Sequence, residues 1–213
     1  MQLSQMKYLL IALLFIGCNQ RSSEKHTVFG YKFREAKSNF PDSITNHFPP
    51  DFDRNLANYS ITYSTNNTEL KLLVHEKPSP DIIDTLIHYY EQRSIAEYSA
   101  ADSCLFVINR FAHYTSTGKL YNQPSSKMQR SSNCSTKYLP IPNFYNFEYH
   151  TRSTISQLDS SYRHYVLAAH KITTTEPSQN WERFLPEDWK NSQSHGVSIS
   201  SKEHRIIYCV LKW

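Results

Sequence analysis

The sequence predicts an α+β fold, a mainly antiparallel sheet of about seven strands with one clear amphipathic helix packed on it. Several segments alternate apolar and polar residues with the period of a strand, whereas one segment has the spacing of an amphipathic helix. Fifteen tyrosines and eleven phenylalanines favour strands, and four glycines leave few flexible linkers in the 213-residue chain. A chain of this length suits one domain, or at most a small pair, with a sizeable core.

A β-hairpin is predicted in the first half of the chain. Apolar and polar residues alternate over 58–65 and again over 68–76, as they do in half-buried strands. Between these segments, Asn66 and Asn67 tolerate the positive φ that a tight antiparallel turn requires. The two segments are therefore expected to pair as neighbouring strands.

The one clear helix is predicted from Ser79 to about Arg93. Ser79 and Pro80 suit the start of a helix, and Asp81 and Asp84 in its first turn are favourable against the helix dipole. Five apolar residues follow the spacing of one buried stripe: Ile82, Ile83, Leu86, Ile87 and Tyr90. We expect this stripe to pack on the sheet.

The remaining strands are predicted from shorter signals. The continuous apolar run at 104–111 is too short for a helix of its own and indicates a buried strand. Aromatic and polar side chains alternate over 144–150, and another strand is predicted over 163–173. Residues 195–213 predict a closing hairpin with its turn near 202–203.

Two segments are predicted to be irregular. Residues 28–53 contain three prolines, which argue against a long helix. Residues 115–142 are rich in Ser, Thr, Asn, Gln and Pro and predict a loop of a length that is uncommon unless the loop is functional or disordered. This loop is one place where a binding surface could lie.

The N-terminal residues have the architecture of an export signal. Lys7 is the only charge before an apolar run from Tyr8 to Ile16, and these nine residues are far fewer than the roughly 20 that cross a bilayer as a helix. The run ends in the sequence FIGC at residues 15–18, which resembles the lipobox of bacterial lipoproteins. The resemblance implies a lipid anchor in place of a membrane span.

In that family the lipobox cysteine, here Cys18, is diacylated, becomes the first residue of the mature protein and receives a third chain on its amine. The chain would then divide into a signal peptide at 1–17, a tether at 18–27 and a single α+β domain at 28–213. The alternative is a soluble secreted protein that is cut elsewhere, with Cys18 as an ordinary half-cystine or a free thiol.

The residues after the lipobox favour the outer membrane. Asn19 is not the aspartate that resembles an inner-membrane retention signal, and residues 19–23 lack the acidic cluster that resembles a surface-export tag in some Bacteroidota lipoproteins. We expect an outer-membrane lipoprotein facing the periplasm, with surface exposure as the alternative. Residues 185–213 are similar to the C-terminal ends of uncharacterised exported Bacteroidota proteins, a group with no activity to transfer.

The cysteine count allows at most one disulfide once Cys18 is acylated, because three cysteines remain. Cys104 and Cys209 lie in apolar runs and are expected to be small buried residues of strands. Cys134 lies in a polar stretch, where its thiol could pair or stay free. No pair has the CxxC spacing of a redox or zinc site.

The charge of the chain does not indicate nucleic-acid binding. The formal net charge is +4, which becomes +3 when Lys7 leaves with the signal, and the positive residues are scattered. No run of basic residues resembles those that mark a nucleic-acid or anionic-lipid surface. The expected partners are therefore the membrane, through the lipid anchor, and an unidentified protein or envelope ligand.

The sequence contains no HExxH motif of a zinc site, no GxSxG motif of a serine hydrolase and no glycine-rich phosphate loop. His164 and His170 fall on one face of a predicted strand, but their separation of six residues, roughly 20 Å, is too far for a shared metal ion. Strand alternation directs His195 and Ser198 to opposite faces. We therefore predict no catalytic residues, no metal and no cofactor.

One aromatic segment, WERFLPEDW at 181–189, predicts a candidate binding surface. Trp181, Phe184 and Trp189 surround Pro186, and flat aromatic surfaces stack on sugars and anchor protein interfaces. The alternative is that these rings cap the open end of the sheet as part of the core.

These observations favour a lipid-anchored cell-envelope protein with a non-enzymatic binding or interaction domain. An immunity or accessory factor held at the membrane would have the same lipid anchor and the same kind of binding domain. The alternative is an unrecognised envelope hydrolase or transferase, which would require titratable side chains that converge in a pocket with perturbed pKa values.

Overall fold

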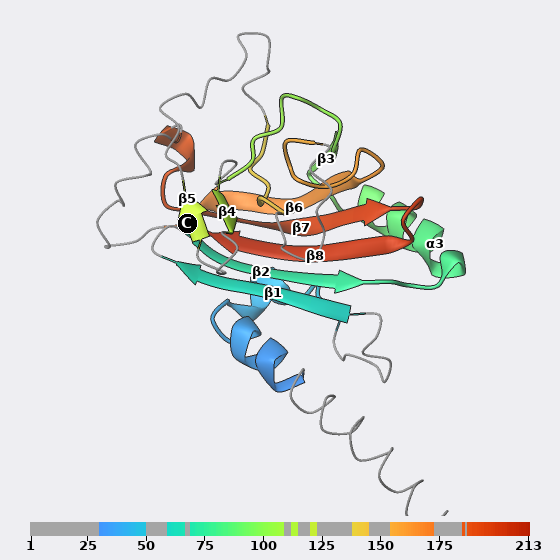
Figure 1. Cartoon of the computed structure of the whole chain (residues 1–213), viewed down its shortest axis with the longest axis horizontal. Helices are drawn as coiled ribbons and strands as arrows, with labels where there is room; N and C mark the ends of the chain where they lie inside the picture. The colour runs from blue at the N-terminus through green and yellow to red at the C-terminus, as the bar shows by residue number, and fades with distance from the viewer. Residues whose placement is uncertain are drawn as a thin grey trace, which may run out of the picture.

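The fold is a six-stranded antiparallel sheet with helices on one face and coil segments on the other. The computed structural model describes residues 30–49, 59–66, 69–108, 112–114, 120–122, 138–144, 154–172, 185 and 187–213. Within them the sheet has the strand order β1-β2-β8-β7-β6-β3, and β4 and β5 form a separate pair (Figure 1).

The strands are β1 (Tyr59–Asn66), β2 (Glu69–Glu76), β3 (Ala96–Ser99), β4 (Ala112–Tyr114), β5 (Leu120–Asn122), β6 (Arg163–Lys171), β7 (Ser192–Ser200) and β8 (Arg205–Lys212). The helical elements are a helix over residues 30–37, α2 (Asp42–Thr45), α3 (Pro80–Glu91) and the 3-10 turn η3 (Glu187–Trp189).

The last strand of the chain, β8, lies in the middle of the sheet. The hairpin of β1 and β2 is followed by α3, which carries the chain to β3 at the opposite edge (Figure 1). β6, β7 and β8 then fill the sheet between β3 and β2 as antiparallel neighbours. The N-terminal hairpin is thus joined to the rest of the sheet through the C-terminal strand.

The predicted α+β class, the hairpin at 58–76, the helix from Ser79, the strand at 163–173 and the closing hairpin are confirmed. The predicted count of about seven strands in one sheet is wrong, because the described residues form a sheet of six strands and a separate pair. One reason is that the described part of a predicted strand, residues 104–108 of 104–111, does not join the sheet.

The described part of that apolar run lies on the sheet and not within it. Val107 makes an isolated parallel bridge with Ile141. Ile108 N donates to Ile141 O at 2.9 Å, and Ile141 N donates to Phe106 O at 3.0 Å. A continuous apolar run indicates burial but does not distinguish a strand from a buried coil segment. The predicted strand at 144–150 lies outside the described residues except for Phe144, which is buried in coil.

The prediction of irregular structure over 28–53 is wrong for residues 30–49, which contain the helix at 30–37 and α2. The prolines do not interrupt these helices, because Pro41 lies just before α2, where a proline is tolerated. Phe33, Ala36 and Phe40 are buried at the spacing of one helical side.

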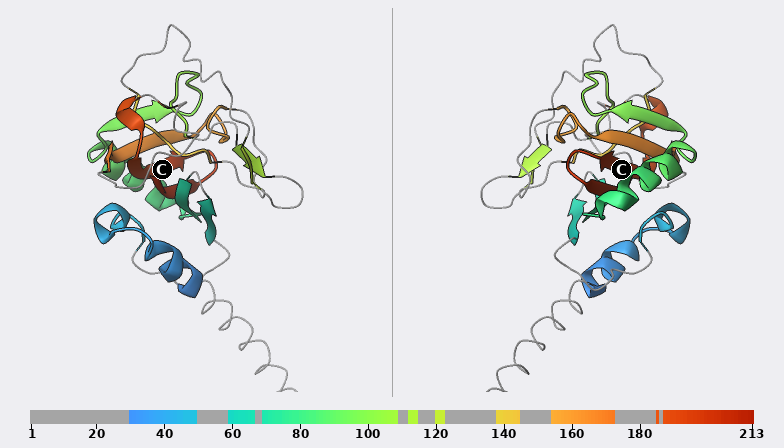
Figure 2. Two further views of the ribbon diagram at one scale, coloured as in Figure 1. Left: turned by 90° about the vertical axis from the view of Figure 1, so that its left-hand side faces the viewer. Right: turned by 90° about the vertical axis from the view of Figure 1, so that its right-hand side faces the viewer.

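One face of the sheet packs against these helices and α3, which lie together on one side (Figure 2). Phe33 of the first helix and Ile83 and Tyr90 of α3 belong to this core. The sheet contributes alternate residues of four strands: Leu72, Val74, Tyr165, Val197, Ile199, Ile206, Tyr208 and Val210. Alternation along each strand places these side chains on one face.

The opposite face is covered by coil from 100–108, 138–144 and 154–162. Leu73, Ile207 and Cys209 point to this side. The coil contributes Ala100, Leu105, Val107, Ile141, Phe144, Leu158 and Tyr162. Because both faces of the sheet are covered, the run at 206–211 is buried throughout, which explains its continuous apolar sequence.

Gly196 allows β6 and β7 to approach closely. A Cβ at this position would lie 2.2 Å from the backbone oxygen of Tyr165, so no larger residue fits without a shift of the strands. Beside it the register shifts between Val166 and Ala168, which leaves one extra residue in β6 as a bulge. The extra residue reverses the faces to which the rest of β6 points.

Candidate functional site

Trp189, the one described residue of the predicted aromatic surface, packs against the core. Its ring is half-buried, and its centroid lies 6.5 Å from that of Phe106. Trp213 Nε1 donates to the backbone oxygen of Trp189 at 2.7 Å, which fixes η3 to the end of β8. Trp181 and Phe184 lie outside the described residues, so a surface formed by all three rings stays a prediction.

A buried histidine and serine meet between β6 and β7, and the sequence alone did not indicate this pair. His164 and Ser198 are opposite each other in the strand register, and His164 Nδ1 lies 2.8 Å from Ser198 Oγ. A hydroxyl within hydrogen-bond distance of an imidazole is also the arrangement of a base-activated nucleophile. Only the pairing register of the two strands could have revealed this contact in advance.

Burial makes this contact a structural one. His164 and Ser198 are each 1% exposed, and the Phe144 ring stacks on the imidazole with 5.3 Å between centroids. Burial lowers the pKa of His164 to about 3, so the imidazole is neutral at pH 7. A substrate cannot reach Ser198 Oγ in this structure, because the pair joins β6 to β7 beneath the coil layer and the Phe144 ring of that layer covers the imidazole.

A second histidine pair, His47 and His195, joins the helical layer to the other face. Their ring centroids are 5.1 Å apart, and His47 Nε2 lies 3.1 Å from the backbone oxygen of Cys209. Burial and the neighbouring His195 lower the pKa of His47 to about 3, while burial lowers the pKa of His195 to about 4. His195 and Ser198 therefore lie on opposite faces of β7, as predicted.

The prediction that His164 and His170 share one face is wrong. The bulge in β6 turns His170 to the opposite side, where its Nε2 lies 2.6 Å from Gln193 Nε2. The two histidines therefore point to opposite faces of the sheet, in addition to lying six residues apart along β6. Among the residues that the structure describes, no three metal-ligating side chains gather at one point.

The exposed side of α3 presents apolar and charged residues together. Ile82 and Tyr89 are 49% and 46% exposed, and Ile95, just past the helix, is 60% exposed. Seven residues separate Ile82 from Tyr89, which places both on the same side of the helix, two turns apart. The guanidinium of Arg93 lies 3.7 Å from the centroid of the Tyr89 ring. Ile82 therefore does not belong to the buried stripe to which it was assigned, because the stripe is centred on Ile83 and Tyr90.

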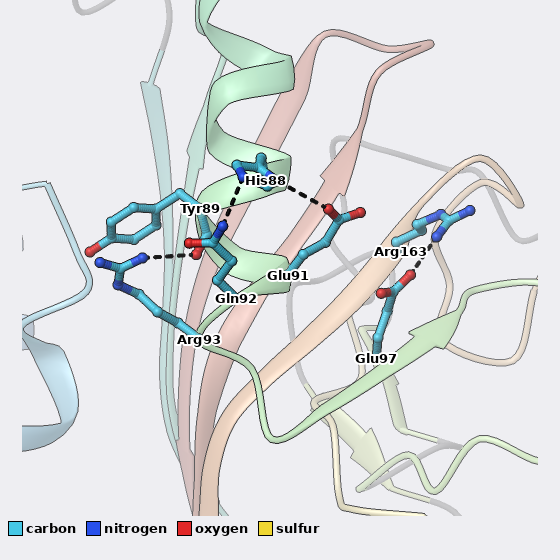
Figure 3. Close-up of polar contacts among 7 residues, drawn as sticks. All are labelled: His88, Tyr89, Glu91, Gln92, Arg93, Glu97 and Arg163. Carbon is cyan, nitrogen blue, oxygen red and sulfur yellow. Dashed lines mark hydrogen bonds and ion pairs between the residues drawn. The ribbon is translucent and has the colours of Figure 1, made fainter.

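Polar contacts surround this exposed side (Figure 3). Arg93 donates to the backbone oxygen of Tyr89 at 3.3 Å, and both side chains project from the same side of α3 (Figure 3). His88 lies 2.8 Å from Gln92 Nε2 and 3.8 Å from a carboxylate oxygen of Glu91. Arg93 is thus held over the Tyr89 ring, while both side chains stay exposed.

The two described cysteines differ in oxidation state. Cys104 is disulfide-bonded and lies in a turn after β3, so the expectation of a buried thiol in a strand is wrong for this residue. Cys209 is free and buried in β8, as predicted; its Sγ lies 3.2 Å from Gly196 O, and burial raises its pKa to about 12. The predicted limit of one disulfide is compatible with both findings. Cys134 lies outside the described residues.

Comparisons with known proteins give no match to any protein-family profile, curated protein or solved structure. Within the described part of the chain, the helices are too short or too polar to cross a membrane. What the domain does is therefore inferred from its own residues.

Acid is expected to destabilise the fold through four histidines whose pKa values are lowered to about 3 or 4: His47, His75, His164 and His195. Each folded pKa lies below the unfolded value near 6.5, so the stabilisation is complete above pH 6.5 and is lost as pH falls toward the folded pKa. The free energy of unfolding, measured with urea at several values between pH 6.5 and 4, gives the slope of stability against pH. His164→Asn should reduce that slope by about 1.4 kcal/mol per pH unit.

The matched control is His88→Asn, because the His88 side chain is 72% exposed. This variant should keep the slope of the parent protein. An unchanged slope in His164→Asn would contradict the assignment of the buried neutral imidazole.

Proposed function

We propose that this chain is an exported lipoprotein, acylated on Cys18 and held at the periplasmic face of the outer membrane, with a domain that binds a protein or another envelope ligand. The disulfide at Cys104 is the observation that supports export most directly. Disulfides form and persist in oxidising compartments such as the bacterial periplasm, and they are rare in the cytosol. This chemistry agrees with the FIGC sequence at residues 15–18.

Binding is favoured over catalysis by where the side chains lie. His47, His164 and His195 serve the attachment of the two layers to the sheet and are neutral at pH 7. The surface of α3 instead presents Tyr89 and Arg93, and aromatic residues and arginine are enriched at protein interfaces. We propose the exposed side of α3 as a contact surface, together with the predicted aromatic segment of Trp181, Phe184 and Trp189.

A hydrolase or transferase is the second candidate, since Ser198 Oγ lies within hydrogen-bond distance of His164. It would require an opening of the coil layer that exposes both side chains, because each is 1% exposed. The binding function needs no such rearrangement and is the one we propose.

Replacement of the anchor cysteine tests the lipoprotein proposal. Cys18→Ala should abolish labelling by a palmitate analogue and move the protein from the membrane to the soluble fraction, because two or three acyl chains make a stable anchor at about 0.8 kcal/mol per buried methylene. Cell fractionation and acyl labelling measure both effects. Cys209→Ala is the matched cysteine control and should stay labelled; retained label on Cys18→Ala would exclude this anchor.

Site-specific photocrosslinking tests the proposed contact surface on α3. A photoreactive residue in place of Tyr89 should give a discrete adduct in intact cells, and Ile82→Glu should remove it, because a charge would lie in the apolar contact. The same probe at Ser201, an exposed turn residue, is the control and should give no adduct. Equal adducts at both positions, or an adduct that survives Ile82→Glu, would contradict a specific surface on α3.

A further inference from the structure

The positive charge of the mature chain is concentrated next to the anchor. Residues 18–37 contain five basic side chains, Arg21, Lys25, Lys32, Arg34 and Lys37, and two acidic ones, Glu24 and Glu35. This segment therefore carries a net charge of +3, which is the whole formal net charge that remains after removal of residues 1–17. Residues 38–213 have equal numbers of basic and acidic side chains.

The helix at 30–37 presents part of this charge on one outward face. Phe33 and Ala36 are buried against the sheet, at 4% and 1% exposure. Tyr31 lies opposite them on the helix and is 62% exposed, the largest exposed fraction among the large apolar side chains described. Lys32 and Arg34 flank Tyr31 on this outward side and are exposed, and so is the acidic Glu35, one turn after Tyr31. The outward side of the helix therefore carries two cations and one anion, a net charge of +1.

An exposed tyrosine beside lysine and arginine fits the surface of a membrane. Tyrosine is enriched at membrane–water interfaces, where its ring lies at the level of the headgroups. Lysine and arginine attract the headgroups of anionic lipids. The apolar side of the helix is already occupied by the domain core, so this helix would contact the surface without inserting its buried side.

The length of the tether brings this face within reach of the membrane. From Cys18 to Gly30 there are twelve peptide steps, and a chain of that length spans at most about 40 Å. The helix at 30–37 is thus the first described element beyond the anchor, and its position is limited by a short connection.

We propose that the face formed by Tyr31, Lys32 and Arg34 contacts anionic phospholipid headgroups of the membrane in which the protein is anchored. The proposal rests on the proposed lipid attachment for its setting, but the contact itself requires no acyl chain. It assigns the end of the domain nearest the anchor to the membrane.

Vesicle binding of the mature chain with Cys18→Ala separates this contact from the acyl anchor. Vesicles of phosphatidylcholine with 30% phosphatidylglycerol should bind this chain, binding should fall as salt is raised, and pure phosphatidylcholine should bind it weakly. Each cation near the surface contributes about a fivefold gain, so Lys32→Gln with Arg34→Gln should lower partitioning by about 25-fold. Tyr31→Ser should lower it further.

The matched control is Lys77→Gln with Lys212→Gln, which removes the same charge from two exposed positions outside the segment. This double variant should bind as the parent does, and circular dichroism should show that all variants are folded. Equal binding to both kinds of vesicle, or an equal loss in the control, would overturn the proposal. Neither result would affect the acyl labelling of Cys18, so failure of the lipid anchor and failure of this contact are distinguishable.

Discussion

The pairing of β8 with β2 on one side and β7 on the other is the interaction on which the rest of the structure depends. Leu70 is paired with Lys212 and Glu76 with Ile206. The N-terminal hairpin and the C-terminal strand are therefore neighbours within one sheet. β8 is buried on both faces, since alternate residues belong to the helical core and to the coil core. Without β8, the N-terminal hairpin would have no neighbour among the described strands.

The two layers are attached to this sheet by polar contacts as well as by apolar packing. On the helical side, His47 reaches the backbone of β8 at Cys209. On the coil side, Lys71 Nζ donates to Asn143 O at 3.0 Å, and Ser194 Oγ donates to Pro140 O at 2.7 Å. Buried polar groups that are hydrogen-bonded restrict the coil segments to one position on the sheet. Among the described residues, buried titratable groups such as His47 and Lys71 thus help to hold the two layers on the sheet.

Local periodicity predicted the parts of the fold that depend on neighbouring residues, including the two hairpins and α3. It failed where a residue's position depends on distant contacts. The apolar run at 104–111 is buried on the sheet in its described part, because its backbone bonds to 138–144. Of the predicted aromatic surface, only Trp189 lies in the described residues. The contact of His164 with Ser198 depends on the pairing of two strands, which the sequence of either strand alone does not reveal. The bulge at Val166 likewise reversed the predicted face of His170.

Native-state hydrogen exchange tests the central role of β8 most directly. Amides of β2, β7 and β8 should exchange last and through one shared opening, whose free energy equals that of global unfolding. The hairpin of β1 and β2 and the helix α3 should not outlast β8, because their core residues pack on strands that β8 holds together. Slow exchange that persists in the hairpin or in α3 after β8 has exchanged would contradict this account.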